Sequence, residues 1–387
     1  MSVIAMMNFD LSPVSFGTAY NTPTNGSGIE PFVGPYNVSN QAATAGKEVI
    51  GVTGREQDKM GGTNSLVVWR DTTGFRPTLT IQPKNQPYLT GTDPFTYTVG
   101  FRFKNSSELS STSFQNGDTL LCIASINNVL SVTSAGLLTF LGGTTGVTLV
   151  FDKEYYFEVK MEWVGGATGA NFYPVFSLYI DGLFIMSRNV TAFTPGASRI
   201  FNVQLGIYRA SLGTTTHRSR WLFSDIYLTD GKGDAPYNGQ LGPQRVKLIV
   251  PDEVVENDWT LTGATATDVI PYLTGAGGRN DTIYLTAPDD DGPATFRFNI
   301  PTTAKSVVNG LTFFARAKRE DGASRPLLGS IKKADGTELN AVPASTLTTA
   351  FVPTLIGQYL PENAAQAANL KDGVLQSMEF TLKAPIA

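Results

Sequence analysis

Hydrophobic and polar side chains alternate with a period of two along several stretches of the chain. In residues 95–104, an aromatic or aliphatic side chain stands at every second position from Phe95 to Phe103, and Thr, Gly, Arg or Lys stands between them. Residues 154–163 repeat this pattern, with Tyr, Phe, Val, Met and Trp alternating with Glu, Tyr and Lys. Successive side chains of a β-strand point to opposite faces, so the pattern predicts two strands that each bury one face.

Turn signals and further alternation extend this prediction. Asp181-Gly182 lies between two apolar runs, which is the strongest short-range signal for a β-hairpin. Residues 201–208 alternate again, and residues 221–228 are apolar on both sides, as in a strand between two packed layers. Helical periodicity is confined to residues 362–373, which predicts one or two turns at most. The fold class is therefore expected to be all-β.

The alternation is interrupted after Pro243 and then resumes. A second set of alternating strands occupies residues 296–300, 311–318 and 378–382. We therefore expect two tandem β-sandwich (jelly-roll) domains, the first at residues 1–247 and the second at residues 248–387.

Composition and charge exclude several partners. The 387 residues carry a formal net charge of −4, and only 16% of them are charged while 41% are hydrophobic. Nucleic acids and anionic membrane surfaces require clusters of Lys and Arg, so no nucleic-acid partner is expected. No apolar run approaches the ~18 residues of a membrane span, and no basic, apolar leader opens the chain. Neither membrane insertion nor a signal peptide is therefore predicted.

The nucleophiles and bases of common enzymes are nearly missing from the sequence. The single cysteine, Cys122, lies in an apolar run and is expected to be a core residue. The single histidine, His217, lies in a polar loop, which favours a solvated side chain over a catalytic base. We therefore predict no catalytic residue and no cofactor.

Glycoside hydrolysis needs only two carboxylates about 5–10 Å apart. Glu154, Glu158 and Glu162 share one face of the strand predicted at residues 154–163. Positions i and i+4 of a strand are roughly 13 Å apart, which is too far for such a pair. The alternation alone explains their spacing, with the glutamates facing solvent.

Three acidic residues surround a glycine-rich turn after the strand at residues 221–228. Asp225, Asp230 and Asp234 are the candidate metal ligands of the chain. Taken as an EF-hand loop that begins at Asp230, the stretch fails at three positions, among them Lys232 and Leu241. No metal site is therefore predicted, although a looser, lectin-type calcium site at these three residues stays open as an alternative.

The order of several short motifs resembles a known family. The succession of "GREQDKMGGTNSLVVWR", "YTVGFRFK", "KEYYFEVKMEW", "VFSLYIDGLFI" and "WLFSDIYLTDGKGDAPYNGQLGPQRV" is similar to the concanavalin A-like (laminin G-like) jelly-roll domain of tailed-bacteriophage structural proteins. "PDEVVENDWTLTG" and "LTFFARAKREDG" continue the similarity into the second half. The matching positions around the last motif are Asp225, Tyr227, Asp230, Gly231, Gly233, Asn238, Leu241, Gly242, Arg245 and Val246.

The resemblance implies a non-enzymatic virion protein at the tail, baseplate, neck or capsid surface. It also implies synthesis in the bacterial cytoplasm, location in the virion, docking on other virion proteins and a homo-oligomer, for which a trimer is the leading expectation. Residues 1–50 match least and are expected to hold the first strand and an arm that docks on a neighbour. The alternative is a glycan-binding module that recognises a host surface, and a polysaccharide depolymerase ranks third.

Overall fold

The structure is a computed structural model. The described residues are 3–7, 36–41, 48–53, 60, 65–70, 78–83, 96–107, 114, 116–123, 126–164, 173–190, 202–208, 219–231, 234, 239–245, 249–265, 268–273, 282–300, 307–319, 326–333, 335–341, 345–347, 349, 351–359, 361, 363–370 and 374–385. The chain divides into two compact units, Met1–Lys247 and Leu248–Ala387.

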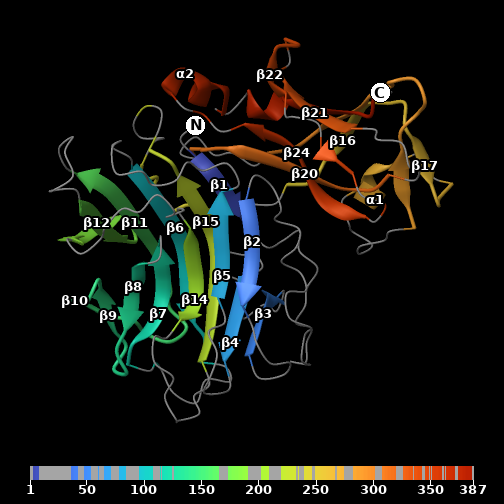
Figure 1. Cartoon of the computed structure of the whole chain (residues 1–387). Coiled ribbons are helices and arrows are strands. Elements are labelled where there is room, and N and C mark those ends of the chain that lie inside the picture. The colour runs from blue at the N-terminus through green and yellow to red at the C-terminus, as the bar shows by residue number, and fades with distance from the viewer. Residues whose placement is uncertain are drawn as a thin grey trace. The chain divides into compact units, whose positions relative to one another are not determined.

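An eight-stranded antiparallel sheet, called sheet A below, forms one layer of the first unit (Figure 1). Its long central strands pair in register, so that Phe101 of one strand faces Phe157 of the next. In spatial order its strands are β13 (Leu183–Asn189), β12 (Tyr173–Ile180), β11 (Glu154–Val164), β6 (Thr96–Asn105), β15 (Ser219–Thr229), β4 (Ser65–Arg70) and β3 (Glu48–Thr53), and β1 (Val3–Met7) also pairs with β15.

A seven-stranded sheet, called sheet B, forms the second layer of this unit. Sheet B is antiparallel as well, and β14 lies between β5 and β7. Its strands in spatial order are β10 (Gly143–Thr148), β9 (Leu137–Phe140), β8 (Ile126–Val132), β7 (Asp118–Ile123), β14 (Val203–Tyr208), β5 (Thr78–Pro83) and β2 (Tyr36–Gln41).

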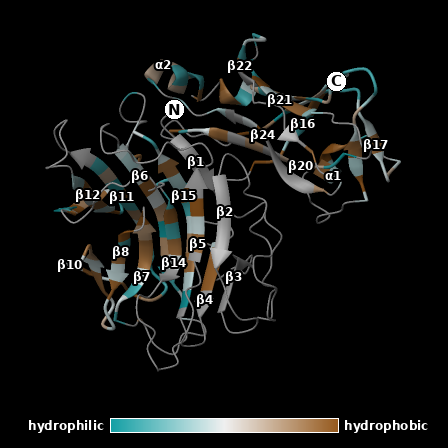
Figure 2. Ribbon diagram, viewed as in Figure 1, coloured by the Kyte–Doolittle hydropathy of each residue, from teal (hydrophilic) through white to brown (hydrophobic). Residues whose placement is uncertain are grey.

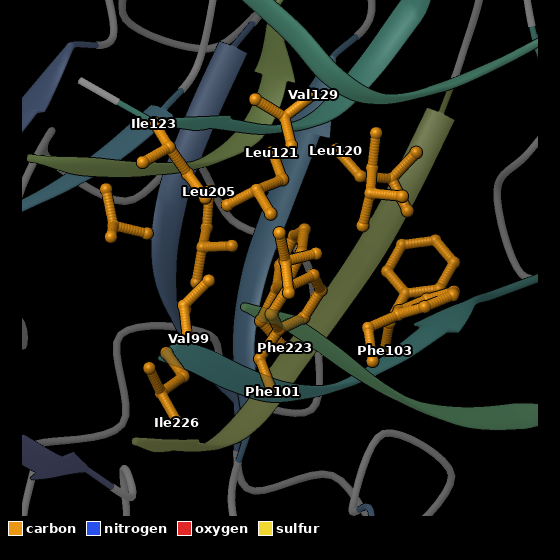
Figure 3. Close-up of a cluster of buried hydrophobic side chains, with 14 of the residues drawn as sticks. Val99, Phe101, Phe103, Leu120, Leu121, Ile123, Val129, Leu205, Phe223 and Ile226 are labelled. Carbon is orange, nitrogen blue, oxygen red and sulfur yellow. The ribbon is translucent and has the colours of Figure 1, made fainter. Parts of the chain in front are cut away.

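The core of the first unit lies between the two sheets. The alternate apolar positions of β6, β11 and β15 point inward, where Phe103 meets the edge of Trp221 at 5.6 Å between ring centroids. Figure 2 shows the apolar and polar residues that alternate along these strands. Side chains of both sheets fill the space between them, among them Val99, Phe101, Leu121, Ile123, Leu205 and Phe223 (Figure 3). The predicted all-β sandwich is thus confirmed, as is the core position of Cys122, which is 2% exposed.

The hairpin predicted at Asp181-Gly182 joins β12 to β13. Both residues have positive φ, 51° for Asp181 and 82° for Gly182, as a two-residue turn of this kind requires. The Asp181 carboxylate accepts a hydrogen bond from the backbone N–H of Tyr156 at 2.8 Å, which fixes the turn against β11.

The second unit is built around a six-stranded antiparallel sheet and two short ribbons. The ring of Phe313 stacks on that of Phe380 at 4.4 Å, so the β20–β24 ribbon packs on the larger sheet. The larger sheet holds β16 (Glu253–Asn257), β19 (Ala294–Arg297), β25 (Glu379–Lys383), β21 (Pro326–Lys332), β22 (Glu338–Ala341) and β23 (Ser345–Thr346). The ribbons are β17 (Thr260–Thr262) with β18 (Tyr284–Thr286), and β20 (Leu311–Ala317) with β24 (Val352–Tyr359).

Helices are few and short within the described residues. They are α1 (Ile270–Leu273), α2 (Ala364–Ala367), η3 (Ala368–Leu370) and η4 (Leu375–Ser377). None of the helices in this part of the chain is long and apolar enough to cross a membrane.

Candidate functional site

The face of sheet A that points away from the core, called the outer face below, is polar and largely buried. Glu158 of β11 and Tyr227 of β15 are both 0% exposed there, although neither belongs to the core. The sequence pattern predicted that Glu154, Glu158 and Glu162 would face solvent. That prediction is wrong for Glu158, because a later segment of the chain covers it.

The covering segment is Gly239–Gln244, called the strap below. Its backbone and side chains bond to the outer face at Glu158, which accepts from the Gly242 N–H at 2.8 Å and from Gln240 Nε2 at 3.1 Å. The Leu241 N–H donates to the Tyr227 hydroxyl at 3.1 Å. The strap also reaches the β12–β13 turn, since a Cβ on Gly182 would lie 3.3 Å from Cδ of Pro243.

Tyr227 reaches Glu158 across an intervening strand. Gly100 of β6 is the register partner of Glu158 on one side and of Tyr227 on the other. A Cβ on Gly100 would lie 2.1 Å from Cε1 of Tyr227, so the ring occupies the space that any side chain at this position would need. The Tyr227 hydroxyl therefore donates to Oε1 of Glu158 over the top of β6.

A buried ion pair lies beside this contact. Arg102 Nε donates to Oδ2 of Asp225 at 2.7 Å, and the two side chains are 11% and 1% exposed. The same guanidinium donates to Glu154 at 3.4 Å and to the backbone oxygen of Gln244 at 3.2 Å. Arg102 thus ties the C-terminal end of the strap to β6, β11 and β15.

Asp225 takes this position because β15 is irregular there. The register between β15 and β6 shifts between Ser224 and Tyr227, and Asp225 has a φ of 49°. A bulge of this kind places an extra residue in the strand and redirects its side chain. The backbone oxygen of Asp225 accepts from the Tyr156 hydroxyl at 3.1 Å, which fills the gap in the ladder.

Two tyrosines of the outer face have strongly shifted acidities. Burial raises the pKa of Tyr227 well above its ordinary value of 10.0, and the negative charge of Glu158 raises it further. The pKa of Tyr156 is raised well above 10.0 by burial first, and then by the charges of Glu158 and Asp225. Both phenols are therefore hydrogen-bond donors throughout the neutral pH range, and not bases.

The structure separates the three acids that the sequence offered as metal ligands. Asp225 is buried in its ion pair with Arg102, Asp230 is half-buried, and Asp234 is exposed. Within the described part of the chain, no group of three His, Cys, Asp or Glu side chains could hold a metal ion. His217, the other residue considered for chemistry, lies outside the described residues.

Beyond the strap, the outer face opens to solvent in a strip made of Lys160, Glu162, Tyr179 and Phe184, called the open strip below. Lys160 Nζ lies 2.5 Å from Glu162 Oε1, with the side chains 26% and 38% exposed. Tyr179 and Phe184 are cross-strand partners on β12 and β13, with ring centroids 5.5 Å apart and an interplanar angle of 66°. Phe184 is 58% exposed.

The open strip adjoins the covered part of the outer face. Tyr179 is the register partner of Glu158, and Lys160 stands two residues further along the same face of β11. In the described part of the chain, the Tyr179 hydroxyl has no hydrogen-bond partner. The strip therefore combines an aromatic pair with one exposed ring, a phenol without a partner in the described residues, a cation and a carboxylate.

Comparison with known proteins gives no family. No protein-family model matches the chain, and no curated protein matches it. Among solved structures, an endo-β-1,4-glucuronan lyase from the fungus Trichoderma reesei matches with a TM-score of 0.37 at 14% identity, over 50% of this chain and 94% of that one. A family 7 alginate lyase, A1-II′, with bound substrate matches with a TM-score of 0.30 at 16% identity, over 49% and 83%. Domain 4 of AbnA, a GH43 extracellular arabinanase from Geobacillus stearothermophilus, in complex with arabinotriose matches with a TM-score of 0.28 at 12% identity, over 59% and 94%.

These comparisons correct the function expected from the sequence. The matching structures named above are carbohydrate-active proteins, two of them polysaccharide lyases, and they provide no link to a phage. The prediction of a non-enzymatic virion protein is therefore contradicted, and so is the prediction that the chain is not an enzyme. At such low identity and TM-scores the overlap transfers no residue, substrate or reaction to this chain. The virion location, the homo-oligomer and the docking partners stay predictions.

Sequence reasoning missed the strap and its partners. Tyr227, Arg102 and Glu158 each sit in a strand pattern that already explains them as alternating positions. One signal was present: Gly100 interrupts an otherwise bulky strand, and a glycine within a strand often marks the close approach of another group. The sequence could have located that approach but not the tyrosine that makes it.

Proposed function

We propose that the first unit is a polysaccharide depolymerase that binds and cleaves its substrate on the open strip of sheet A. The observation that carries this proposal is the half-buried Tyr179 and the exposed Phe184, in ring contact beside the Lys160–Glu162 ion pair. Sugar rings have an apolar face that stacks on aromatic rings and a rim of hydroxyl groups that needs polar partners, and aromatic side chains commonly serve such half-apolar, half-wet contacts. The open strip supplies both kinds of contact on one sheet face.

The groups of the strip favour elimination over hydrolysis. Hydrolysis requires two carboxylates about 5–10 Å apart, whereas Glu162 and Glu158 are four residues apart on one strand, roughly 13 Å, and Glu158 is fully buried. Elimination from an acidic sugar requires instead a cation for the sugar carboxylate and a base for the neighbouring proton. Lys160 and the free phenol of Tyr179 supply these two groups.

The proposed elimination needs only side chains of the open strip and solvent water. As the Tyr179 hydroxyl gives its proton to water, its oxygen takes the proton from the carbon next to the uronate carboxyl group, and the electron pair left behind forms a carbon–carbon double bond. The C–O bond to the leaving sugar then breaks, and its oxygen takes a proton from water. Lys160 stabilises the charge that develops on the carboxyl group, since an ammonium has three donors and Glu162 engages only one side of it.

The test is an activity assay on the whole chain with alginate, glucuronan and arabinan. Elimination gives new reducing ends together with an unsaturated product that absorbs in the ultraviolet, whereas hydrolysis gives reducing ends alone. We expect ultraviolet-absorbing products from an acidic polysaccharide and at least a hundredfold loss of rate in Tyr179→Phe, in line with the loss of a general base. Lys160→Met should also lose activity.

Tyr173→Phe is the matched control, because Tyr173 is another half-buried tyrosine of β12 with no hydrogen bond in the described part of the chain. This variant should keep the wild-type rate. Absence of cleavage with all three polysaccharides, including binding without cleavage, would overturn the proposal. Wild-type activity in Tyr179→Phe would overturn the assignment of its site.

A further inference from the structure

The part of the outer face near the strap carries more polar groups than the protein satisfies. Oγ1 of Thr98 on β6 and Oγ of Ser224 on β15 are fully buried and have no hydrogen-bond partner in the described part of the chain. Ser224 is the register partner of Arg102, and Thr98 is that of Lys160. Two unpartnered hydroxyl groups therefore lie on the same face as Glu158 and Arg102, and the closed strap leaves both unsatisfied.

The strap is held by polar contacts and not by a hydrophobic interface. Each of its residues is half-buried or exposed. Glu158, Tyr227 and Arg102 make hydrogen bonds to it, and the Gln244 backbone also bonds to Tyr156. Thr229 adds a longer hydrogen bond to the Gly239 oxygen at 3.4 Å. A polar ligand that supplies the same hydrogen bonds can replace the strap at these groups, because each bond contributes far less net free energy than its strength in isolation.

We propose that the strap is a gate over a second part of the sugar-binding surface, an inference that rests on the polysaccharide function proposed above. The N–H groups of Leu241 and Gly242 occupy positions that the hydroxyl groups of a sugar would take as donors to Tyr227 and Glu158. When the strap lifts, a polyhydroxylated sugar bonds to Glu158 and to the hydroxyl groups of Thr98 and Ser224. In the closed state Arg102 Nη2 donates to the backbone oxygen of Gln244. In the open state the same N–H group donates to a sugar hydroxyl or carboxylate.

The covered surface is continuous with the open strip. Glu158 lies directly opposite Tyr179 across the β11–β12 ladder, and Lys160 follows it on the same strand face. A polysaccharide bound at Tyr179 and Lys160 therefore meets the edge of the strap at its next sugar residue. In the closed state the polysaccharide can bind only on the open strip. Lifting the strap extends the sugar-binding surface toward β6 and β15.

The experiment measures amide hydrogen exchange of the whole chain, with and without alginate, glucuronan and arabinan oligosaccharides. If the strap is a gate, the amides of Leu241 and Gly242 exchange by local opening. Their exchange rates should then depend less on denaturant concentration than the exchange rate of the Val159 amide in β11. Gln240→Ala removes one hydrogen bond to Glu158 and should speed their exchange roughly fivefold. Asp234→Ala, an exposed residue outside the strap, should leave it unchanged.

Ligand binding decides the proposal. A saturating oligosaccharide should speed exchange at Leu241 and Gly242 while Val159 stays protected, and Gln240→Ala should bind the oligosaccharide more tightly than wild type. Slower or unchanged exchange at the strap on binding would overturn the gate but leave the polysaccharide function standing. Failure of all three oligosaccharides to bind would instead overturn the polysaccharide function, and the gate with it.

Discussion

The ring of Tyr227 lies over Gly100, and the close packing of these two residues allows β15 to bond directly to β11 across β6. A Cβ at position 100 would come within 2.1 Å of the ring, and the hydroxyl beyond it donates to the buried Glu158. This contact supports the strap, since Tyr227 and Glu158 together accept three hydrogen bonds from Gln240, Leu241 and Gly242.

Gly100→Ala should destabilise the first unit, because the added methyl group must displace the Tyr227 ring. Overpacking of this kind typically costs about 1–3 kcal/mol, and we expect a loss in that range in denaturant unfolding. Gly239→Ala is the matched control, since a Cβ there would meet no atom within 4 Å. A Gly100→Ala variant as stable as wild type would show that the ring can move away at no cost.

Tyr227→Phe should destabilise the first unit more than Tyr179→Phe does. The change leaves the Leu241 N–H without its acceptor and removes one donor from Glu158, which predicts a loss of about 1–3 kcal/mol. Tyr179→Phe removes a hydroxyl that has no partner in the described part of the chain, and should change stability by less than about 0.5 kcal/mol. Chemical denaturation of both variants checks the difference, and equal effects would contradict the assigned roles.

Asp225→Asn tests the buried ion pair with Arg102. Removal of one partner of a buried pair costs about 3–5 kcal/mol, and we expect the lower end because Glu154 and Gln244 still bond to the guanidinium. Asn tolerates the positive φ at this position, so the effect reports the lost charge and not backbone strain. Asp234→Asn, at an exposed position, should be neutral by the same measurement.

Alkaline pH should destabilise the first unit through Tyr156 and Tyr227. Their pKa values are raised in the folded state, so the folded state holds protons that the unfolded state releases above about pH 10. Their contribution to stability is therefore complete below about pH 10 and falls as the pH rises beyond it. The free energy of unfolding should fall less steeply with rising pH for Tyr227→Phe than for wild type. Identical slopes would argue against a raised pKa of Tyr227.

Calcium should not alter the stability of the chain through the acids of the turn after β15. Asp225 is engaged with Arg102 at 2.7 Å, and Asp234 is exposed, so they do not converge on one point. Thermal unfolding with calcium and with a chelator should coincide. A rise in melting temperature with calcium that Asp230→Asn removes would restore the lectin-type site that the sequence left open.

Much of the first unit could be predicted from its alternation. The patterns at residues 95–104 and 154–163 correspond to β6 and β11, and Asp181-Gly182 forms the predicted hairpin turn. The candidate site could not be predicted in the same way. Glu158 has the same local pattern as Glu162, yet one is buried and the other is part of the open strip, because only one of them lies beneath the strap.

The sequence by itself determined the strands, their inward faces and the all-β class, because a period of two is a local property that each strand carries alone. Tertiary structure decided what the outward faces do. Residues 239–244 fold back over β15 and β11, and Tyr227 crosses Gly100, through contacts that join positions 69 and 84 residues apart in the chain. Hydrogen bonds over such separations leave no periodic trace in the sequence, so the covered acid, the buried phenols and the open strip beside them became visible only when the sheet was assembled.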